Sequence, residues 1–349
     1  MKKLTYLPRV LLGLGLLAGN LHAQTNASYK VLDTTRLMGS GGTDYVFADN
    51  DGRRIYVPRG NSTLVFDLDS HKYIGAITNI SGHGIAVDTK THHGFSSSPQ
   101  IGMFDTETMQ KIKSIEVSGR PDGILLEPFT DKIYIFSHES PSITVIEPKD
   151  GTVVGTIDVG GAMEEARSDG RGKLFADVED EKKIAVIDVK AMKVIKKFDL
   201  DESAGNPGGL GLDAKNHILF AMCARPNVCV VVNADNGKTL ATLPIGNGTD
   251  GGGFNPNTME AFSSQRDGTL TIIKENSPTN FVVEQTVQTK SGCRTSSLDT
   301  KNNRIVLICT ERPPGAPVPA PMTNAPAGQR RGGGGRGGPG NLDVLWVGR

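Results

Sequence analysis

The chain has 349 residues, of which 38 are basic and 38 acidic, so its formal net charge is zero with histidine neutral. This balance argues against a general binder of polyanions. Aromatic residues are scarce and glycine is abundant, at 43 residues. Short apolar runs rich in Val and Ile alternate with Gly, Asn, Asp and Pro, and no segment has the period of a sustained amphipathic helix. The composition therefore predicts an all-β protein.

The N-terminus has the layout of a secretory signal peptide, which we assign to residues 1–23. A basic head precedes an apolar run over residues 10–18, and Leu21-His22-Ala23 offers an aliphatic residue and a small residue before the cleavage point. The run is too short to span a bilayer, and glycines between positions 13 and 19 disfavour a buried N-terminal element. We expect an exported protein, periplasmic or secreted, with no transmembrane segment in the mature chain.

A repeat of about forty residues organises the rest of the chain as one domain, residues 29–349. An acid or amide ends the first strand of each unit, at intervals of 39 to 44 residues: Asp49, Asp88, Glu127, Asp169, Asp213, Asn255 and Asp299. These side chains recur with the turns, so we interpret them as turn caps and not as catalytic groups. Each unit supplies four short strands, A to D, which predicts a seven-bladed β-propeller with four-stranded antiparallel blades.

The seventh unit lacks one outer strand. After strand B (Ile305–Cys309) and a long insertion, only Leu342–Val347 remains, and it contains Trp346, the one tryptophan. The segment Tyr29–Asp33 has the length and composition to supply the missing strand. We therefore expect the N-terminal strand to complete the last blade and close the ring, with Trp346 on the strand between the two.

Several units resemble the repeat of the YVTN, or YncE-like, β-propellers within the WD40/YVTN repeat-like superfamily. The resemblance rests on Ile55–Asp67, on Ile133–Ile135 followed by Ile143–Ile146, and on Gly151–Ile157, and it covers residues 29–349 apart from the insertion. It implies the propeller fold and an exported binding or surface protein. Relatives in the wider superfamily carry haem d1 or are subunits of quinohaemoprotein dehydrogenases.

We call the acid or amide that ends each first strand the marker of its unit. Charged side chains recur at one height of the repeat, five residues before each marker. The seven residues at this height are Asp44, His83, Asp122, Glu164, Gly208, Asp250 and Arg294. Since the neighbouring heights are mostly apolar, we expect the switch from core to charge to mark the mouth of the central channel. Two interpretations stay open: these side chains solvate the opening, or they bind a ligand.

The ligand-binding candidates are nine residues at or beside this height: Asp44, His83, Arg120, Asp122, Glu164, Glu165, Arg167, Asp250 and Arg294. Carboxylates and an imidazole are ligands for a divalent cation, so Asp44, His83, Asp122 and Glu164 form a candidate metal site. We expect no cofactor. The alternative to this expectation is that the site binds calcium or another divalent cation. Arg294 and Arg120 could bind an anion. His138 lies in a B–C turn and is left out of the site.

Four cysteines suit an exported protein. Their places at the ends of neighbouring strands predict two disulfides, Cys223–Cys229 and Cys293–Cys309, with four buried thiols as the alternative. The insertion, residues 312–341, is rich in Pro and Ala and then in Arg and Gly, so we expect disorder there. Arginine–glycine tracts can bind nucleic acid, but this one has no interleaved aromatic residue, which does not favour that role.

The sequence contains no HExxH, CxxC or GxSxG motif, and no catalytic residue is assigned. The favoured function is an exported, non-catalytic binding or scaffold protein that engages a small polar ligand or an unknown protein partner on the channel face. The alternative is a metal-assisted hydrolase or lactonase that uses the carboxylate arc.

Overall fold

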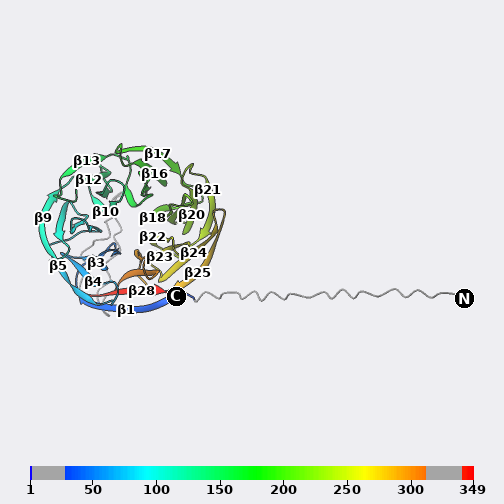
Figure 1. Ribbon diagram of the computed structural model, residues 1–349, viewed down its shortest axis with the longest axis horizontal. Helices are drawn as coiled ribbons and strands as arrows, with labels where there is room; N and C mark the ends of the chain where they lie inside the picture. Colours follow the sequence, from blue (N-terminus) through cyan, green and yellow to red (C-terminus); the bar gives the residue numbers. More distant parts are fainter. Residues whose placement is uncertain (2–27, 312–339) are drawn as a thin grey trace, which may run out of the picture.

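The computed structural model describes Met1 and residues 28–311 and 340–349, which form a ring of seven four-stranded sheets (Figure 1). Beyond Met1, the expected signal peptide lies outside these ranges, as does the expected insertion up to residue 339. Nowhere in the described ranges is there a helix with the length and apolar character needed to cross a membrane. The expected seven-bladed propeller is confirmed.

The first six blades each consist of four consecutive strands. Blade 1 contains β2 (Phe47–Asp49), β3 (Arg54–Arg59), β4 (Ser62–Asp67) and β5 (Tyr73–Thr78). Blade 2 contains β6 (Ile85–Asp88), β7 (His93–Ser96), β8 (Gln100–Asp105) and β9 (Gln110–Glu116). Blade 3 contains β10 (Pro121–Glu127), β11 (Lys132–Ser137), β12 (Ile143–Ile146) and β13 (Val153–Ile157).

Blades 4 to 6 follow the same order. Blade 4 contains β14 (Met163–Ser168), β15 (Lys173–Val178), β16 (Lys183–Asp188) and β17 (Lys193–Asp199). Blade 5 contains β18 (Asn206–Asp213), β19 (Ile218–Ala224), β20 (Val228–Asn233) and β21 (Thr239–Pro244). Blade 6 contains β22 (Thr249–Asn255), β23 (Glu260–Gln265), β24 (Thr269–Ser277) and β25 (Asn280–Gln288).

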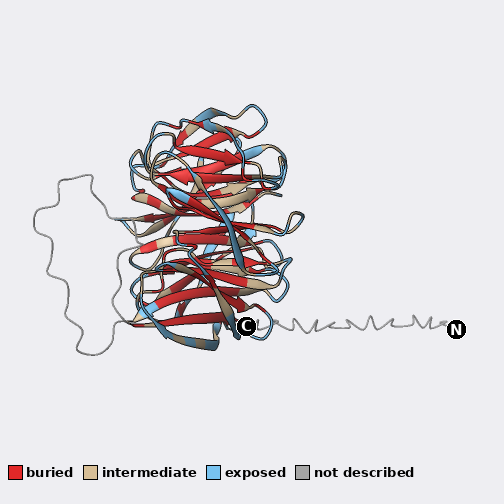
Figure 2. Ribbon diagram, turned by 90° about the vertical axis from the view of Figure 1, so that its left-hand side faces the viewer, coloured by how far each residue is buried: buried red, intermediate tan, exposed pale blue. Residues whose placement is uncertain are grey.

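Burial within a blade depends on distance from the channel. The middle strands are covered on both faces by neighbouring blades, and much of the strand ribbon is buried (red in Figure 2). For example, β12 is buried along its whole length. The outer strands face solvent, and β9 is exposed at all but one position. This explains why the middle strands are continuous apolar runs whereas the outer strands are mixed in polarity.

The recurring acids and amides at the ends of the A strands cap turns, as expected. Asp49 accepts a hydrogen bond from the backbone N–H of Gly52 at 2.9 Å, and Asp213 accepts one from Lys215 at 2.9 Å. A side-chain oxygen that satisfies backbone donors two or three residues later fixes the A–B turn of each blade. These turns orient the A strands, which line the channel.

Both ends of the chain build blade 7. It contains β26 (Ser296–Asp299), β27 (Arg304–Glu311), β28 (Gly340–Gly348) and, outermost, β1 (Lys30–Gly39). The expected closure is therefore confirmed, although β1 extends six residues beyond the predicted segment. Arg36 on β1 holds the fully buried Asp343 of β28 through two hydrogen bonds of 2.7 and 2.8 Å, and Lys290 contacts the same carboxylate.

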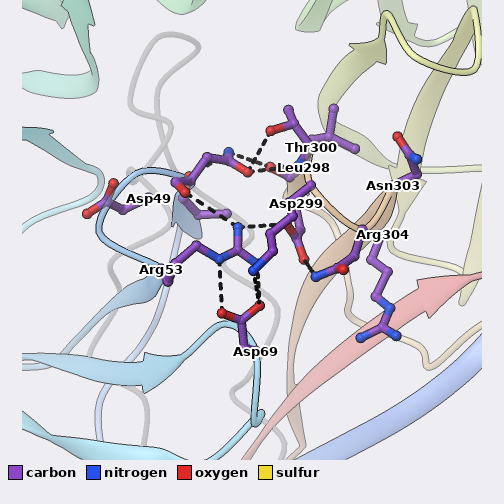
Figure 3. A network of polar contacts seen from close by, with 12 residues as sticks. Asp49, Arg53, Asp69, Leu298, Asp299, Thr300, Asn303 and Arg304 are labelled. Atoms are coloured by element: carbon purple, nitrogen blue, oxygen red, sulfur yellow. Dashed lines mark hydrogen bonds and ion pairs between the residues drawn. The ribbon is translucent and has the colours of Figure 1, made fainter.

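Blade 7 is also joined to blade 1 through apolar and polar contacts. Trp346 lies on β28, between β27 and β1, and is fully buried. It packs into a cluster with core residues of blade 1, and its ring stacks on His71 at 4.1 Å between ring centroids. Near the A–B turns, Arg53 of blade 1 contacts Asp299 of blade 7 at 2.9 Å and Asp69 at 2.8 Å (Figure 3). The seam that closes the ring therefore has its own core and its own ion pairs.

One expected disulfide is present and the other is wrong. Cys293 and Cys309 are bonded. Cys223 and Cys229 are free, buried thiols. In the β19–β20 ladder Cys229 pairs with Met222, the neighbour of Cys223. Because successive residues of a strand point to opposite faces, the two thiols pack into different clusters, on opposite sides of blade 5.

Candidate functional site at the channel mouth

A histidine bridges two carboxylates where blades 1, 2 and 3 meet the channel mouth. His83 Nδ1 lies 2.6 Å from Asp44 Oδ2 and 3.0 Å from Asp122 Oδ1. Carboxylates only accept, so Nδ1 carries a proton. Burial opposes charge on the ring, but the hydrogen bonds to Asp122 and Asp44 outweigh it and raise the pKa of His83 to about 10. His83 is therefore an imidazolium at neutral pH.

An arginine extends this chain of charges through blades 7 and 6. Arg294 Nη2 lies 2.8 Å from Asp44 Oδ1, and its Nη1 contacts Asp250 Oδ2. Arg266 approaches the same oxygen of Asp250 at 3.7 Å. Burial raises the pKa of Asp250 to about 6, and the charge of Arg294 opposes this shift. Alternating acids and bases thus connect Asp250 to Asp122 around most of the mouth.

A second group of side chains bonds across the channel from blades 1, 3 and 4. The Tyr45 hydroxyl lies 3.1 Å from Asp122 Oδ2 and 3.2 Å from Glu164 Oε2. His138 Nε2 lies 3.2 Å from Asp122 and 3.5 Å from Glu164. Burial and the nearby Asp122 raise the pKa of the Glu164 carboxyl well above its usual value.

The tautomer of His138 follows from its other neighbour. Arg120 Nη2 lies 2.6 Å from His138 Nδ1. A guanidinium group only donates, so Nδ1 accepts and the ring carries its proton on Nε2, facing Asp122 and Glu164. Together with His83, this ring holds the pKa of Asp122 well below its usual range, although burial acts in the opposite direction.

Glu165 and Arg167 form a separate pair in the channel wall. Glu165 Oε2 accepts from the backbone N–H groups of Leu210 at 3.0 Å and Gly252 at 3.4 Å, and from Arg167 Nη2 at 3.0 Å. Arg167 also donates to the Gly252 carbonyl at 2.6 Å. Burial raises the pKa of Glu165, with Arg167 opposing the shift. The pair connects blade 4 with blades 5 and 6.

A cavity of about 330 Å³ occupies the channel next to this network. The charged residues of its lining are Glu164, Glu165 and Arg167, and Tyr45 also contributes. Most other lining side chains are aliphatic or aromatic. They include Phe47, Ile85, Ile124, Leu125, Phe136, Phe254, Phe262 and Leu298. The cavity is therefore apolar along its walls and acidic where Glu164 faces it.

The sequence-predicted residues fall into three groups. The network contains Asp44, His83, Asp122, Glu164, Asp250 and Arg294. Arg120 is joined to it by a hydrogen bond to His138, and Glu165 with Arg167 is a separate pair. Gly208, at the same height, contributes no side chain.

Sequence reasoning missed Tyr45 and His138, which join the two halves of the network. A signal for Tyr45 exists one position after the predicted height, where four other blades have glycine: Gly84, Gly123, Gly209 and Gly251. A large side chain at that height has room to cross the channel. The sequence has no comparable signal for His138, because its position depends on the shape of the B–C turn in blade 3.

Two groups of side chains could supply metal ligands in the described residues. One consists of Asp44, His83 and Asp122, and the other of Asp122, His138 and Glu164. In both, the histidine nitrogen that faces the carboxylates carries a proton in this arrangement. A metal ion would have to displace that proton, and at His138 it would also have to displace Arg120 or reverse the tautomer. The donor types suit a divalent cation, whereas the hydrogen-bonding pattern requires a proton on each histidine nitrogen that faces the carboxylates.

Comparison with solved structures finds chains of similar fold. The chain matches the structure of U3-55K with a TM-score of 0.70 and 11% identity, covering 91% of this chain and 99% of that one. It matches the WD40 repeats of RRP9 with a TM-score of 0.69 and 11% identity, covering 91% and 100%. Hydrazine synthase of Kuenenia stuttgartiensis matches with a TM-score of 0.64 and 16% identity, covering 77% and 92%.

Identities this low establish the fold alone. No family model matches the chain, and no curated protein matches it in sequence. The chain is a seven-bladed β-propeller whose structural neighbours include WD40-repeat proteins.

Proposed function

We propose that this chain is an exported, non-catalytic binding propeller of the YVTN, or YncE-like, type that engages a small polar ligand or a protein partner on its channel face. The observation that carries the proposal is the charge pairing at the mouth. His83 and Arg294 neutralise Asp44, and His83 and His138 hold Asp122. Catalysis by a nucleophile or general base needs a group free to give or take a proton, whereas these groups are held in fixed positions, as recognition requires.

Two further observations support export and the binding role. The residues that resemble a signal peptide direct a chain to an oxidising compartment, and the bonded pair Cys293–Cys309 is typical of proteins that mature there. WD40-like propellers, the fold class of the structural neighbours, are commonly scaffolds or binding modules.

Assays of the purified mature protein against lactone, ester and redox substrate panels test the proposal. We expect no turnover above that of a His83→Gln variant, which removes the central cation of the network. Turnover by the wild-type protein that disappears in this variant would refute the non-catalytic function. Circular dichroism of both proteins ensures that the comparison is made between folded chains.

A metal-assisted hydrolase or lactonase is the second candidate, because the two possible ligand groups share Asp122. Asp44, His83, Asp122 and Glu164 would hold the ion. This candidate predicts a bound divalent ion after dialysis and a rise in melting temperature with calcium that a chelator reverses. A metal-free protein with no thermal response to calcium or to the chelator would leave the hydrolase without its cofactor.

A further inference from the structure

Glu164 is the one charged lining residue of the cavity that lacks a Lys or Arg partner in the described part of the chain. Glu165 and Arg167 neutralise each other. The contacts of Glu164 are the Tyr45 hydroxyl at 3.2 Å and His138 Nε2 at 3.5 Å. Its carboxylate therefore accepts a hydrogen bond from Tyr45 and has His138 at a longer distance, without a Lys or Arg beside it.

The surroundings of Glu164 add negative charge. Asp122, a second acid, shares both of its neighbours: it lies 3.1 Å from the Tyr45 hydroxyl and 3.2 Å from His138 Nε2. The cations of the network, His83 and Arg294, bind Asp44, Asp122 and Asp250 and do not contact Glu164. A largely covered carboxylate next to a second acid, with no Lys or Arg of its own, is stabilised by a positive charge that arrives from outside.

The cavity beside this carboxylate suits an organic molecule better than a bare ion. Its volume of about 330 Å³ lies at the lower end of the range for small-molecule sites. Phe136 and Glu164 both line this cavity. Phe47 and Phe254 add further aromatic surface, and aromatic faces attract cations.

We propose that the channel cavity binds a small organic cation, a protonated amine on an apolar or aromatic body, with its ammonium group at Glu164 and the Tyr45 hydroxyl. This inference rests on the proposed binding function and names the ligand class of that site. An ammonium group requires acceptors alone, so it leaves the Arg120–His138 hydrogen bond and the proton on His138 in place. A metal ion ligated by His138 together with Glu164 would disrupt both.

Titration calorimetry and thermal shift on the purified mature protein test the proposal with benzylamine as the probe. Benzyl alcohol, of similar shape without the charge, is the matched ligand, and calcium and zinc chlorides are the inorganic arms. We expect benzylamine to bind at least about tenfold more tightly than the alcohol, equivalent to about 1.4 kcal/mol. Glu164→Gln keeps the shape and the hydrogen-bond acceptor, and we expect it to lose this preference.

Glu139→Gln is the control substitution. It removes the same charge from an exposed residue of the B–C turn next to His138, so it should leave benzylamine affinity unchanged. Glu164→Gln should fold, because it removes a charge that burial opposes, and its melting temperature verifies this. Tyr45→Phe keeps the ring that crosses the channel and should weaken amine binding less than Glu164→Gln does.

Three results would overturn the proposal. Equal affinity for the amine and the alcohol would show a cavity without charge selectivity, and the binding function would stand. Full benzylamine affinity in Glu164→Gln would locate the amine elsewhere. Binding of calcium or zinc, or of no probe at all, with no response to benzylamine would exclude the organic cation. Turnover in the substrate panels would instead refute the non-catalytic function, whatever the amine result.

Discussion

Replacing Trp346 by alanine should destabilise the ring at its closing seam. The side chain is fully buried between blade 7 and blade 1, and its indole nitrogen has no hydrogen-bond partner among the described residues. Loss of about 200 Å² of buried ring surface at about 25 cal/mol per Å² corresponds to about 5 kcal/mol. Tryptophan-to-alanine changes in cores cost about 3–5 kcal/mol, so we expect the free energy of unfolding to fall by about 4 kcal/mol.

Urea unfolding followed by circular dichroism measures this effect, since the variant has no tryptophan fluorescence. Phe220→Ala is the matched control, because Phe220 is fully buried in the seam between blades 5 and 6, where the chain is continuous. If the closing seam belongs to the same cooperative unit, both variants should lower the midpoint with the wild-type slope. A loss below about 1 kcal/mol for Trp346→Ala, or a reduced slope, would refute the reasoning.

Three other perturbations have defined outcomes. Arg36 and Lys290 hold the pKa of Asp343 below its usual range despite burial. The contribution of this carboxylate to stability should therefore be present above about pH 4 and be lost as the pH falls through the lowered folded-state pKa. Asp343→Asn should flatten that part of a curve of unfolding free energy against pH. Reduction of the Cys293–Cys309 bond, whose partners are 16 residues apart, should cost about 3 kcal/mol in the chain-entropy model, and an equal melting temperature with and without reductant would contradict this. Deleting residues 312–339 with a two-residue Gly-Asn replacement should leave a cooperative melt, because the ends of β27 and β28 pair directly; aggregation of the deletion variant would contradict this.

The blade count could be predicted because turn chemistry is local. Asp49 and its counterparts cap turns through backbone groups two or three residues away, so they recur in the sequence with the turns. The closing strand was predictable from the strand missing in the last unit. Its full extent, Lys30–Gly39, was not, because an outer strand faces solvent and its mixed polarity resembles a loop.

The height of the candidate site was predictable, but most of its bonds were not. A constant offset from the turn markers brings Asp44 and His83 to one height, as the structure confirms. Which acid meets which base depends on distances across the channel, and these are set by the curvature of the whole ring. The disulfide predicted between Cys223 and Cys229 failed for a similar reason. Their spacing along the chain brings the two cysteines near each other, but the register of the hairpin decides which face of the blade each thiol occupies.

Joining the two chain ends in one blade also has a kinetic consequence. The contact between Arg36 and Asp343 spans 307 residues. The length-dependent entropy of closing so long a loop is about 5 kcal/mol, against about 2 kcal/mol for a ten-residue hairpin. Hairpins within blades 1 to 6 can therefore form early, whereas β1 can dock only after the last strand is in place. The same strand, at the outer edge and with a solvent-facing surface, should be the first to exchange its amide hydrogens and the first to admit a protease.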